Sequence, residues 1–255
     1  DVVLAYGGND ALSAIQVQVP VTTRFLPHGH KLSFGMVSAA ALSDHKGPVV
    51  ARQAALDVAR FEQQGCYSPH VFYVQRGGRL SPEEFAEHLA SALTALQHKW
   101  SRRVLALEES AVVGSWRETH ELAALNSARE KVLGGDAHWG CVVFSDQALP
   151  LTPGPLNRNV LVVAVDSLDE VAELVVLQRD FLQTVGLAAA PEELLHLAEC
   201  LGQVGVTRLC AVGAMTAPEA GWHHDGRFSL LDLVRWVDIE DSTERSSENF
   251  TSYEL

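Results

Sequence analysis

The chain has 255 residues, 47% of them hydrophobic, which is enough to form one large domain or two small ones around a sizeable core. The formal net charge is −13, whereas binding to nucleic acid or to anionic lipid needs clustered Lys and Arg, so we expect neither kind of partner. We find no apolar run of about 18 residues, no secretory signal pattern and no C-x-x-C spacing among the four cysteines. We therefore expect a reduced, cytoplasmic protein rather than a disulfide-linked one.

The chain begins with Asp1 rather than with Met and opens directly into an apolar strand over 2–5. We therefore expect that the natural polypeptide begins earlier and that an N-terminal portion is absent. A turn at Gly7 and Gly8 follows and leads into a short helix over 11–16. Such a turn can bind a phosphate through free backbone N–H groups. The full dinucleotide fingerprint is absent, so an ordinary strand-to-helix turn is the alternative.

Two histidines, His28 and His30, flank a glycine just after the next expected strand, 21–25. They could be metal ligands, acid–base groups or solvated loop residues. Metal binding is disfavoured, because no Cys, Asp or Glu lies at ligand spacing from them, and we expect no metal site.

Cys66 lies between an expected helix over 49–64 and an expected strand over 70–74, with Gly65 ending the helix. A side chain in such a helix-to-strand corner can face a cleft, so this thiol is a candidate nucleophile. The alternative is a buried structural cysteine, since free cysteines are among the most buried residues. Apolar residues that share roughly one face of the expected helix are Val49, Val50, Leu56, Val58 and Phe61.

From residue 81 onward, helices and strands alternate. Capping-box sequences at Ser81 and Ser167 begin two helices, which we expect to run to about His98 and Gln183. Further expected helices cover 104–132, with a break near Gly114, and 191–201; further expected strands cover 139–144, 159–165, 185–189 and 206–212. Buried strands without alternation are typical of parallel sheets, so this order predicts an α/β protein with a mostly parallel sheet.

The C-terminal part differs in composition. A loop over 216–226 carries the sequence Trp222-His223-His224-Asp225, which could bind a metal or a substrate, or could simply form a turn with solvated histidines. An apolar stretch over 228–237 follows. From Asp238 onward the chain is acidic and Ser-rich, and we expect its end to be frayed.

Three stretches carry a resemblance to a known family: 61–69 (Phe-Glu-Gln-Gln-Gly-Cys-Tyr-Ser-Pro), 29–34 (Gly-His-Lys-Leu-Ser-Phe), and 221–226 together with 233–236. The chain resembles the bacterial fatty acyl-CoA reductases of the luminescence system, a branch of the aldehyde dehydrogenase superfamily. The order and spacing of the elements are also similar to the catalytic domain of that superfamily over nearly the whole chain.

The resemblance implies an aldehyde dehydrogenase-like fold with helices on both faces of the sheet. It makes Cys66 the nucleophile that accepts the acyl group of a fatty acyl-CoA or acyl-protein thioester. Hydride from NADPH would then release a long-chain aldehyde, with Gly7 and Gly8 facing the cofactor. It also implies an acyl-activating enzyme as a partner, and a homo-oligomer in which 233–240 extends the sheet of a neighbouring subunit.

The same resemblance suggests three parts of the chain. Residues 1–30 would be the last part of a dinucleotide-binding domain, 31–214 the catalytic cysteine domain, and 215–255 a C-terminal loop, an oligomerisation strand and an acidic tail. The dinucleotide-binding strands and the oxyanion-binding asparagine of the superfamily have no counterpart in this sequence. We therefore expect the chain by itself to bind NADPH weakly and to show little or no activity.

One departure from the superfamily pattern concerns the chemistry. Enzymes that oxidise aldehydes carry a water-activating glutamate where this chain has Pro27, which favours acyl reduction over aldehyde oxidation. His28 and His30 are the nearest replacements, and of the two we favour His30 as the acid–base group. A helix C-terminus does not lower a thiol pKa, so activation must come from a histidine, the cofactor ring or backbone N–H groups after Cys66. The alternatives are a non-catalytic scaffold with a structural cysteine, and an acyltransferase or thioesterase.

Overall fold

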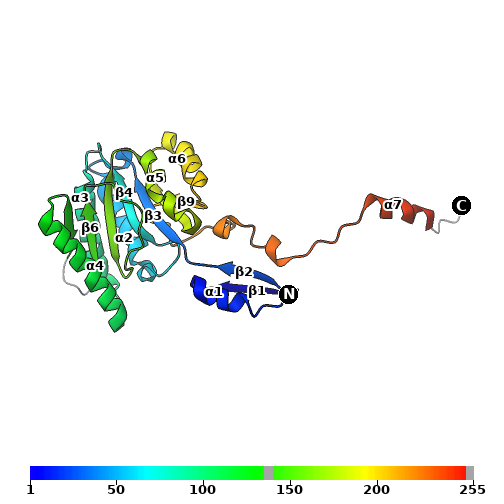
Figure 1. The fold of residues 1–255 in the computed structure, drawn as a ribbon. Helices are drawn as coiled ribbons and strands as arrows, with labels where there is room; N and C mark the ends of the chain where they lie inside the picture. Colours follow the sequence, from blue (N-terminus) through cyan, green and yellow to red (C-terminus); the bar gives the residue numbers. More distant parts are fainter. Residues whose placement is uncertain (135–139, 251–255) are drawn as a thin grey trace.

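The computed structural model describes residues 1–134 and 140–250, and a seven-stranded sheet forms the centre of the described chain (Figure 1). The strand order is β5-β6-β7-β4-β3-β8-β9, and all neighbouring pairs are parallel except β5 with β6. The strands are β3 (Leu32–Val37), β4 (Pro69–Gln75), β5 (Glu130–Leu133), β6 (Cys141–Ser145), β7 (Asn159–Val165), β8 (Leu182–Ala188) and β9 (Arg208–Ala211).

Helices pack on both faces of this sheet and give it two separate apolar cores. On one face, α2 (Lys46–Ala59) and α3 (Pro82–Lys99) cover the first core. On the other, α5 (Val171–Val175) and α6 (Pro191–Gln203) cover the second, to which α4 (Leu107–Asn126) contributes Trp116. The prediction of an α/β protein with a mostly parallel sheet is therefore confirmed. No helix in the described part of the chain combines the length and apolar character needed to cross a bilayer.

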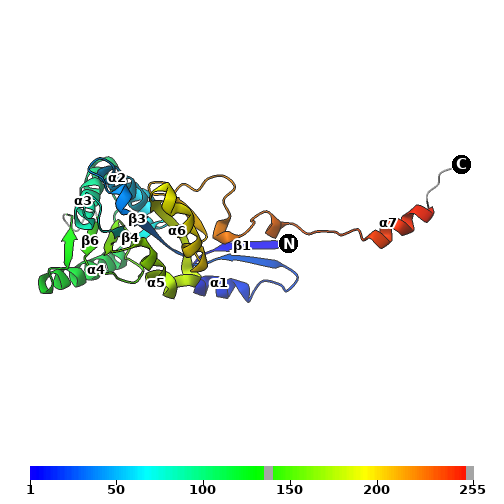
Figure 2. The same cartoon turned by 90° about the horizontal axis from the view of Figure 1, so that it is seen from above.

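A second, two-stranded parallel sheet projects from this body (Figures 1 and 2). It pairs β1 (Val2–Tyr6) with β2 (Arg24–His28), and α1 (Asn9–Gln16) connects the two strands. The segment after residue 222 returns along this small sheet, where Arg24 Nη1 donates to the backbone oxygens of Asp232 and Val234. The chain then extends away from the body and ends in α7 (Asp241–Ser247), where the sequence predicted a frayed tail.

The chain before Cys66 differs from its prediction. The helix ends at Ala59 rather than at Gln64, and a 3₁₀ turn, Arg60–Gln63, follows it. Phe61, Glu62 and Gln63 have left-handed backbone angles (φ 53°, 53° and 60°), which no helix can contain. Hydrogen bonds from the backbone of residues 157 and 159 to Glu62 and Gln63 hold this turn. Of the apolar residues assigned to one helix face, Val49 and Phe61 are exposed.

Several other element boundaries were wrong. The helix predicted over 104–132 runs without a break through Gly114 but ends at 126, because residues 130–133 pair with β6 as an edge strand. The helix predicted after Ser167 is interrupted by 3₁₀ turns, and residues 182–184 belong to β8. The strand predicted over 21–25 lies at 24–28. The strand predicted over 206–212 covers only 208–211, where it is a partly exposed edge strand rather than a buried one. No strand forms over 233–240, and Gly135 and Trp139 lie outside the described residues.

Candidate active site

A cleft of about 370 Å³ lies where the small sheet meets the large one, and Cys66 is in its wall. The lining residues of the large sheet come from the amino ends of four parallel strands: Lys31 precedes β3, Cys66 precedes β4, Leu156 precedes β7, and Gln183 is the second residue of β8. The small sheet adds the end of β2 and the turn after β1. Open α/β sheets ordinarily bind ligands at the carboxyl ends of their strands. This cleft lies at the opposite ends, because the small sheet forms its second wall there.

Cys66 is half-buried, and the hydroxyl of Ser33 donates to its backbone oxygen over 2.7 Å. Burial raises the pKa of the Cys66 thiol, and the Asp225 carboxylate raises it further. Hydrogen bonds from the Gln183 side chain and from the backbone N–H groups of Cys66 and Tyr67 act in the opposite direction, but burial outweighs them. The thiol is therefore protonated at neutral pH, and a base has to accept its proton before it can attack.

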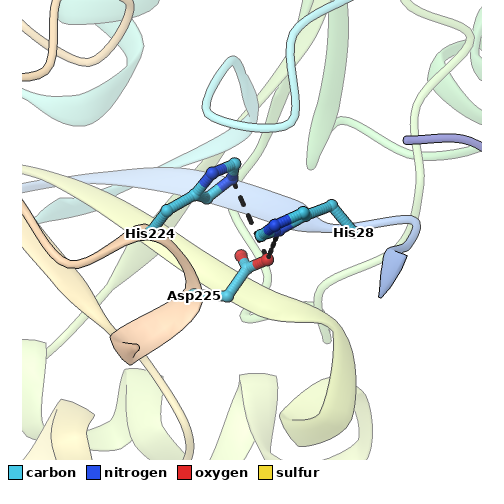
Figure 3. A group of neighbouring side chains, drawn as sticks. All are labelled: His28, His224 and Asp225. Carbon is cyan, nitrogen blue, oxygen red and sulfur yellow. Dashed lines mark hydrogen bonds and ion pairs between the residues drawn. The ribbon is translucent and has the colours of Figure 1, made fainter. Parts of the chain in front are cut away.

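Asp225 connects the two sheets through His28 and Gln183, and Figure 3 shows its carboxylate beside the His28 ring. One carboxylate oxygen lies 2.8 Å from His28 Nδ1, and the other accepts a 2.6 Å hydrogen bond from Gln183 Nε2. Burial favours the protonated acid, but the hydrogen bonds from Gln183 and His28 outweigh it, so the pKa of Asp225 lies below its ordinary value. An ionised carboxylate can only accept, so the proton of His28 is on Nδ1 and the lone pair is on Nε2.

His28 is also the second ring in a stack of four. Its centroid lies 4.6 Å from that of Tyr6 and 4.3 Å from that of His224, which in turn stacks on Trp222 at 4.9 Å. The donor atoms of His28, His224 and Asp225 lie within 4.8 Å of one another, a spacing that a metal could use. The two imidazole planes are only 18° from parallel, however, so their in-plane lone pairs run side by side instead of converging on one point. The arrangement suits hydrogen bonding better than chelation.

The other candidates from the sequence line the same cleft. His30 is exposed, with its ring 6.1 Å from that of Phe181. Gly7 and Gly8 form the turn between β1 and α1, where the Gly7 N–H donates to the backbone oxygen of His28. A Cβ at Gly8 would meet no atom within 4 Å, so the backbone there is open on the cleft side. The structure therefore brings Cys66, His28, His30, Gly7 and Gly8 together, although 58 residues separate Gly8 from Cys66.

The sequence model of the family described as acyl-CoA reductase (LuxC) matches residues 1–236. The chain belongs to the acyl-CoA reductase (LuxC) family. Long-chain acyl-protein thioester reductases from Photorhabdus luminescens and Vibrio harveyi are 26% and 24% identical to it over 242 residues, which are 94% of this chain and 47% of each relative. The chain thus spans about half the length of the curated relatives it matches.

Solved structures show that the fold is that of the aldehyde dehydrogenases. The NAD-dependent aldehyde dehydrogenase from Burkholderia multivorans superposes with a TM-score of 0.58 at 16% identity, over 84% of this chain and 41% of that one. The Delta-pyrroline-5-carboxylate dehydrogenase from Mycobacterium tuberculosis superposes with a TM-score of 0.59 at 15% identity, over 87% and 43%. The predicted family and the predicted fold of this LuxC-family chain are both confirmed.

Two residues of the cleft were missed at the sequence level, His70 and Gln183. His70 is the second residue of β4 and is 6% exposed, and its Nδ1 accepts a 3.0 Å hydrogen bond from the backbone N–H of Gly154. The sequence did contain a signal for His70, because it is a polar side chain at the start of an otherwise apolar predicted strand. Gln183 gave no signal, because it was placed at the end of a predicted helix.

A second cavity, of about 500 Å³, lies beside α4 and is lined by Arg102, Arg103 and Arg117. It is larger than the cleft around Cys66, but none of its described lining residues is a cysteine or a histidine. Guanidinium groups remain protonated at ordinary pH and cannot act as nucleophiles or bases. The chemistry of the LuxC-family chain therefore points to the smaller cleft.

Proposed function

We propose that this chain provides the acyl-accepting site of a fatty acyl thioester reductase. Cys66 takes the acyl group of a fatty acyl-CoA or acyl-protein thioester as an enzyme-bound thioester, which is then reduced to a long-chain aldehyde. The observation that carries the proposal is the position of the Cys66 thiol in one cleft with the His28–Asp225 pair, in a chain of the LuxC family.

His28 accepts the proton of Cys66 in this proposal. The thiol needs a base because burial raises its pKa, and His28 has its Nε2 lone pair available because Nδ1 donates to Asp225. The sequence favoured His30 for this role. His30 has no carboxylate partner among the described contacts, whereas Asp225 fixes both the tautomer and the orientation of His28. We therefore assign the acid–base role to His28.

NADPH is the proposed reductant, and it supplies a hydride when bound. Gly7 and Gly8 would face it, because the turn before α1 offers backbone N–H groups without side-chain capping and with open space at Gly8. Pro27 cannot act as a base toward water, and its side chain is exposed, whereas the next residue along β2, His28, lines the cleft. This arrangement favours reduction of the acyl-enzyme over its hydrolysis.

We also propose that the C-terminal segment pairs with a second copy of the chain. Large apolar side chains are exposed along it, including Phe228, Trp236, Val237 and Ile239, although 233–240 forms no strand in the single chain. The mass of the chain in solution, measured by light scattering before and after removal of residues 228–255, tests this proposal. An unchanged monomeric mass in both would contradict it.

Acylation of Cys66 tests the central proposal. The chain is incubated with hexadecanoyl-CoA, and intact mass is measured before and after treatment with hydroxylamine, which cleaves thioesters. One added acyl group that hydroxylamine removes is expected, and Cys66→Ser should lose it. Cys200→Ser and Cys210→Ser are matched controls and should retain it. A label that survives Cys66→Ser, or no label on the unaltered chain, would favour a scaffold in which Cys66 is structural.

A further inference from the structure

His70 lies deep in the cleft, four residues after the proposed nucleophile. It is 6% exposed, and it contributes to the wall of the cleft between Cys66 and the loop that carries Gly154. Its position is set by β4, which pairs with β3 on one side and β7 on the other. A side chain on a central strand is held more rigidly than one on a loop, so the imidazole has a fixed place relative to Cys66.

The hydrogen bond from Gly154 fixes the tautomer of this ring. A backbone N–H can only donate, so His70 Nδ1, 3.0 Å away, must be unprotonated. The proton of the neutral ring is therefore on Nε2. Burial lowers the pKa of His70 to about 4, and the nearby His30 lowers it as well, so the ring stays neutral throughout the physiological range. His70 is thus a neutral donor rather than a base.

The Nε2–H group has no acceptor among the described residues. His70 lines the cleft, so an occupant of the cleft can provide an acceptor for this donor. The strong acceptor of a thioester is its carbonyl oxygen, because its sulfur accepts only weakly. We infer that His70 Nε2–H donates a hydrogen bond to the carbonyl oxygen of the thioester that Cys66 attacks. This inference rests on the proposed function.

Transfer of the acyl group to Cys66 requires no proton from His70. His28 takes the thiol proton, Cys66 Sγ bonds to the carbonyl carbon, and the π pair of the carbonyl moves onto oxygen. His70 stabilises that oxyanion and keeps its own proton. The carbonyl then re-forms, the bond to the departing thiolate breaks, and that thiolate takes the proton from His28. The two histidines thus have separate roles, His28 as acid–base group and His70 as electrophile.

Two variants of similar shape test the two nitrogens of the His70 imidazole separately. Asparagine places an amide oxygen near Nδ1, so His70→Asn keeps an acceptor for the Gly154 N–H but loses the donor. Glutamine reaches the position of Nε2, so His70→Gln keeps a donor there. The initial rate of Cys66 acylation by hexadecanoyl-CoA should fall about 10²-fold in His70→Asn, as for other oxyanion donors, and less in His70→Gln.

Alkylation of Cys66 by iodoacetamide involves no oxyanion and is the control. Its rate should stay within about twofold of the unaltered chain in both variants. Acylation in His70→Asn as fast as in the unaltered chain would overturn the inference. So would an equal loss of acylation and alkylation, because that would indicate a structural role. If the unaltered chain itself is not acylated at Cys66, the proposed function fails first.

A measurement on Cys66→Ser tests His70 without acyl transfer and without altering His70. Long-range ¹H–¹⁵N correlation spectra should show a neutral His70 with its proton on Nε2 between pH 5 and 8. That Nε2–H resonance should shift when hexadecanoyl-CoA is added. A ring protonated on Nδ1, or no shift at saturating hexadecanoyl-CoA, would overturn the inference.

Discussion

Glu62 and Arg158 form a buried, two-pronged ion pair: Arg158 Nε and Nη2 each lie 2.8 Å from a carboxylate oxygen of Glu62. The two residues belong to two left-handed turns, 61–63 and 156–158, which a backbone hydrogen bond from Asn157 to Glu62 also joins and which contribute to the wall of the cleft. Residues other than glycine adopt such angles at a cost of about 1–3 kcal/mol each, so other contacts must hold both turns. The ion pair joins them, and thereby fixes the chain at Glu62, four residues before Cys66.

Removing one partner of this pair should destabilise the fold. Arg158 is 3% exposed and also donates to Gln97 and to the backbone oxygen of Trp100. Arg158→Leu therefore leaves the Glu62 carboxylate without its cationic partner and removes both of these hydrogen bonds. We expect the free energy of unfolding to fall by about 3–5 kcal/mol. Equilibrium urea unfolding, followed by tryptophan fluorescence, measures the change.

Arg76→Ala is the matched control. Arg76 pairs with Asp146 and Asp166 at the surface, where water screens the charges, and its loss should cost less than about 1 kcal/mol. Equal losses in Arg158→Leu and Arg76→Ala would contradict the importance of burial for the Glu62–Arg158 pair.

These turns show why part of the fold could not be predicted. The helix capped by Ser81 and the buried strand over 159–165 were predicted nearly to the residue, because capping boxes and continuous apolar runs are local signals. The left-handed turn before Cys66 depends instead on partners 96 residues further along the chain. The residues of this turn still satisfy a helical pattern, so the predicted helix extended five residues too far.

The candidate site, too, could be predicted from the sequence only in part. Cys66 and the turn of Gly7 and Gly8 could be singled out because a corner cysteine and a glycine pair are visible in the sequence itself. Asp225 and His224 were noticed as a cluster but without a partner. His28 and His70 differ chemically because His28 pairs with Asp225 and His70 accepts from the Gly154 N–H. Both partners come from loops that are distant in the sequence.

The pH dependence of Cys66 alkylation should respond in opposite directions to two substitutions. Asp225→Asn removes a negative charge that raises the thiol pKa, so the apparent pKa should fall. Gln183→Leu removes a hydrogen bond that lowers it, so the apparent pKa should rise. Iodoacetamide rates between pH 6 and 11, with Cys66 followed by peptide mass spectrometry, measure both. Shifts in the same direction would contradict the described geometry around the thiol.

The capping box of α3 gives a test of local stability. Ser81 Oγ accepts from the Glu84 N–H over 3.2 Å, and the Glu84 carboxylate accepts from the Ser81 N–H over 2.7 Å. Ser81→Ala should therefore lower the free energy of unfolding by about 1 kcal/mol. Thr119→Ala is the control, because its exposed hydroxyl only donates to a carbonyl within α4, and its change should stay within about 0.5 kcal/mol. A larger loss for Thr119→Ala than for Ser81→Ala would show that the cap contributes little.

Asp57 connects the body of the protein to the segment that carries His224 and Asp225. It is fully buried in α2, and its carboxylate accepts from the backbone N–H groups of Gly213 and Met215. Burial raises its pKa to about 6, even though these backbone donors act to lower it. Asp57→Ala would leave those donors without an acceptor, and we expect a loss of about 3 kcal/mol in the free energy of unfolding.

The raised pKa of Asp57 predicts how stability should change with pH. The folded chain binds the proton with a pKa of about 6 and the unfolded chain with one near 3.8, so the folded state holds more protons between these values. The contribution of this carboxyl is fully present below pH 3.8 and is lost as the pH rises through about 6. The unfolding free energy of the unaltered chain, minus that of Asp57→Asn, should therefore increase by up to about 3 kcal/mol from pH 7 to pH 4. Urea unfolding of both chains across this range measures the difference, and a difference that stays constant or decreases toward pH 4 would show that Asp57 is ionised in the folded state throughout.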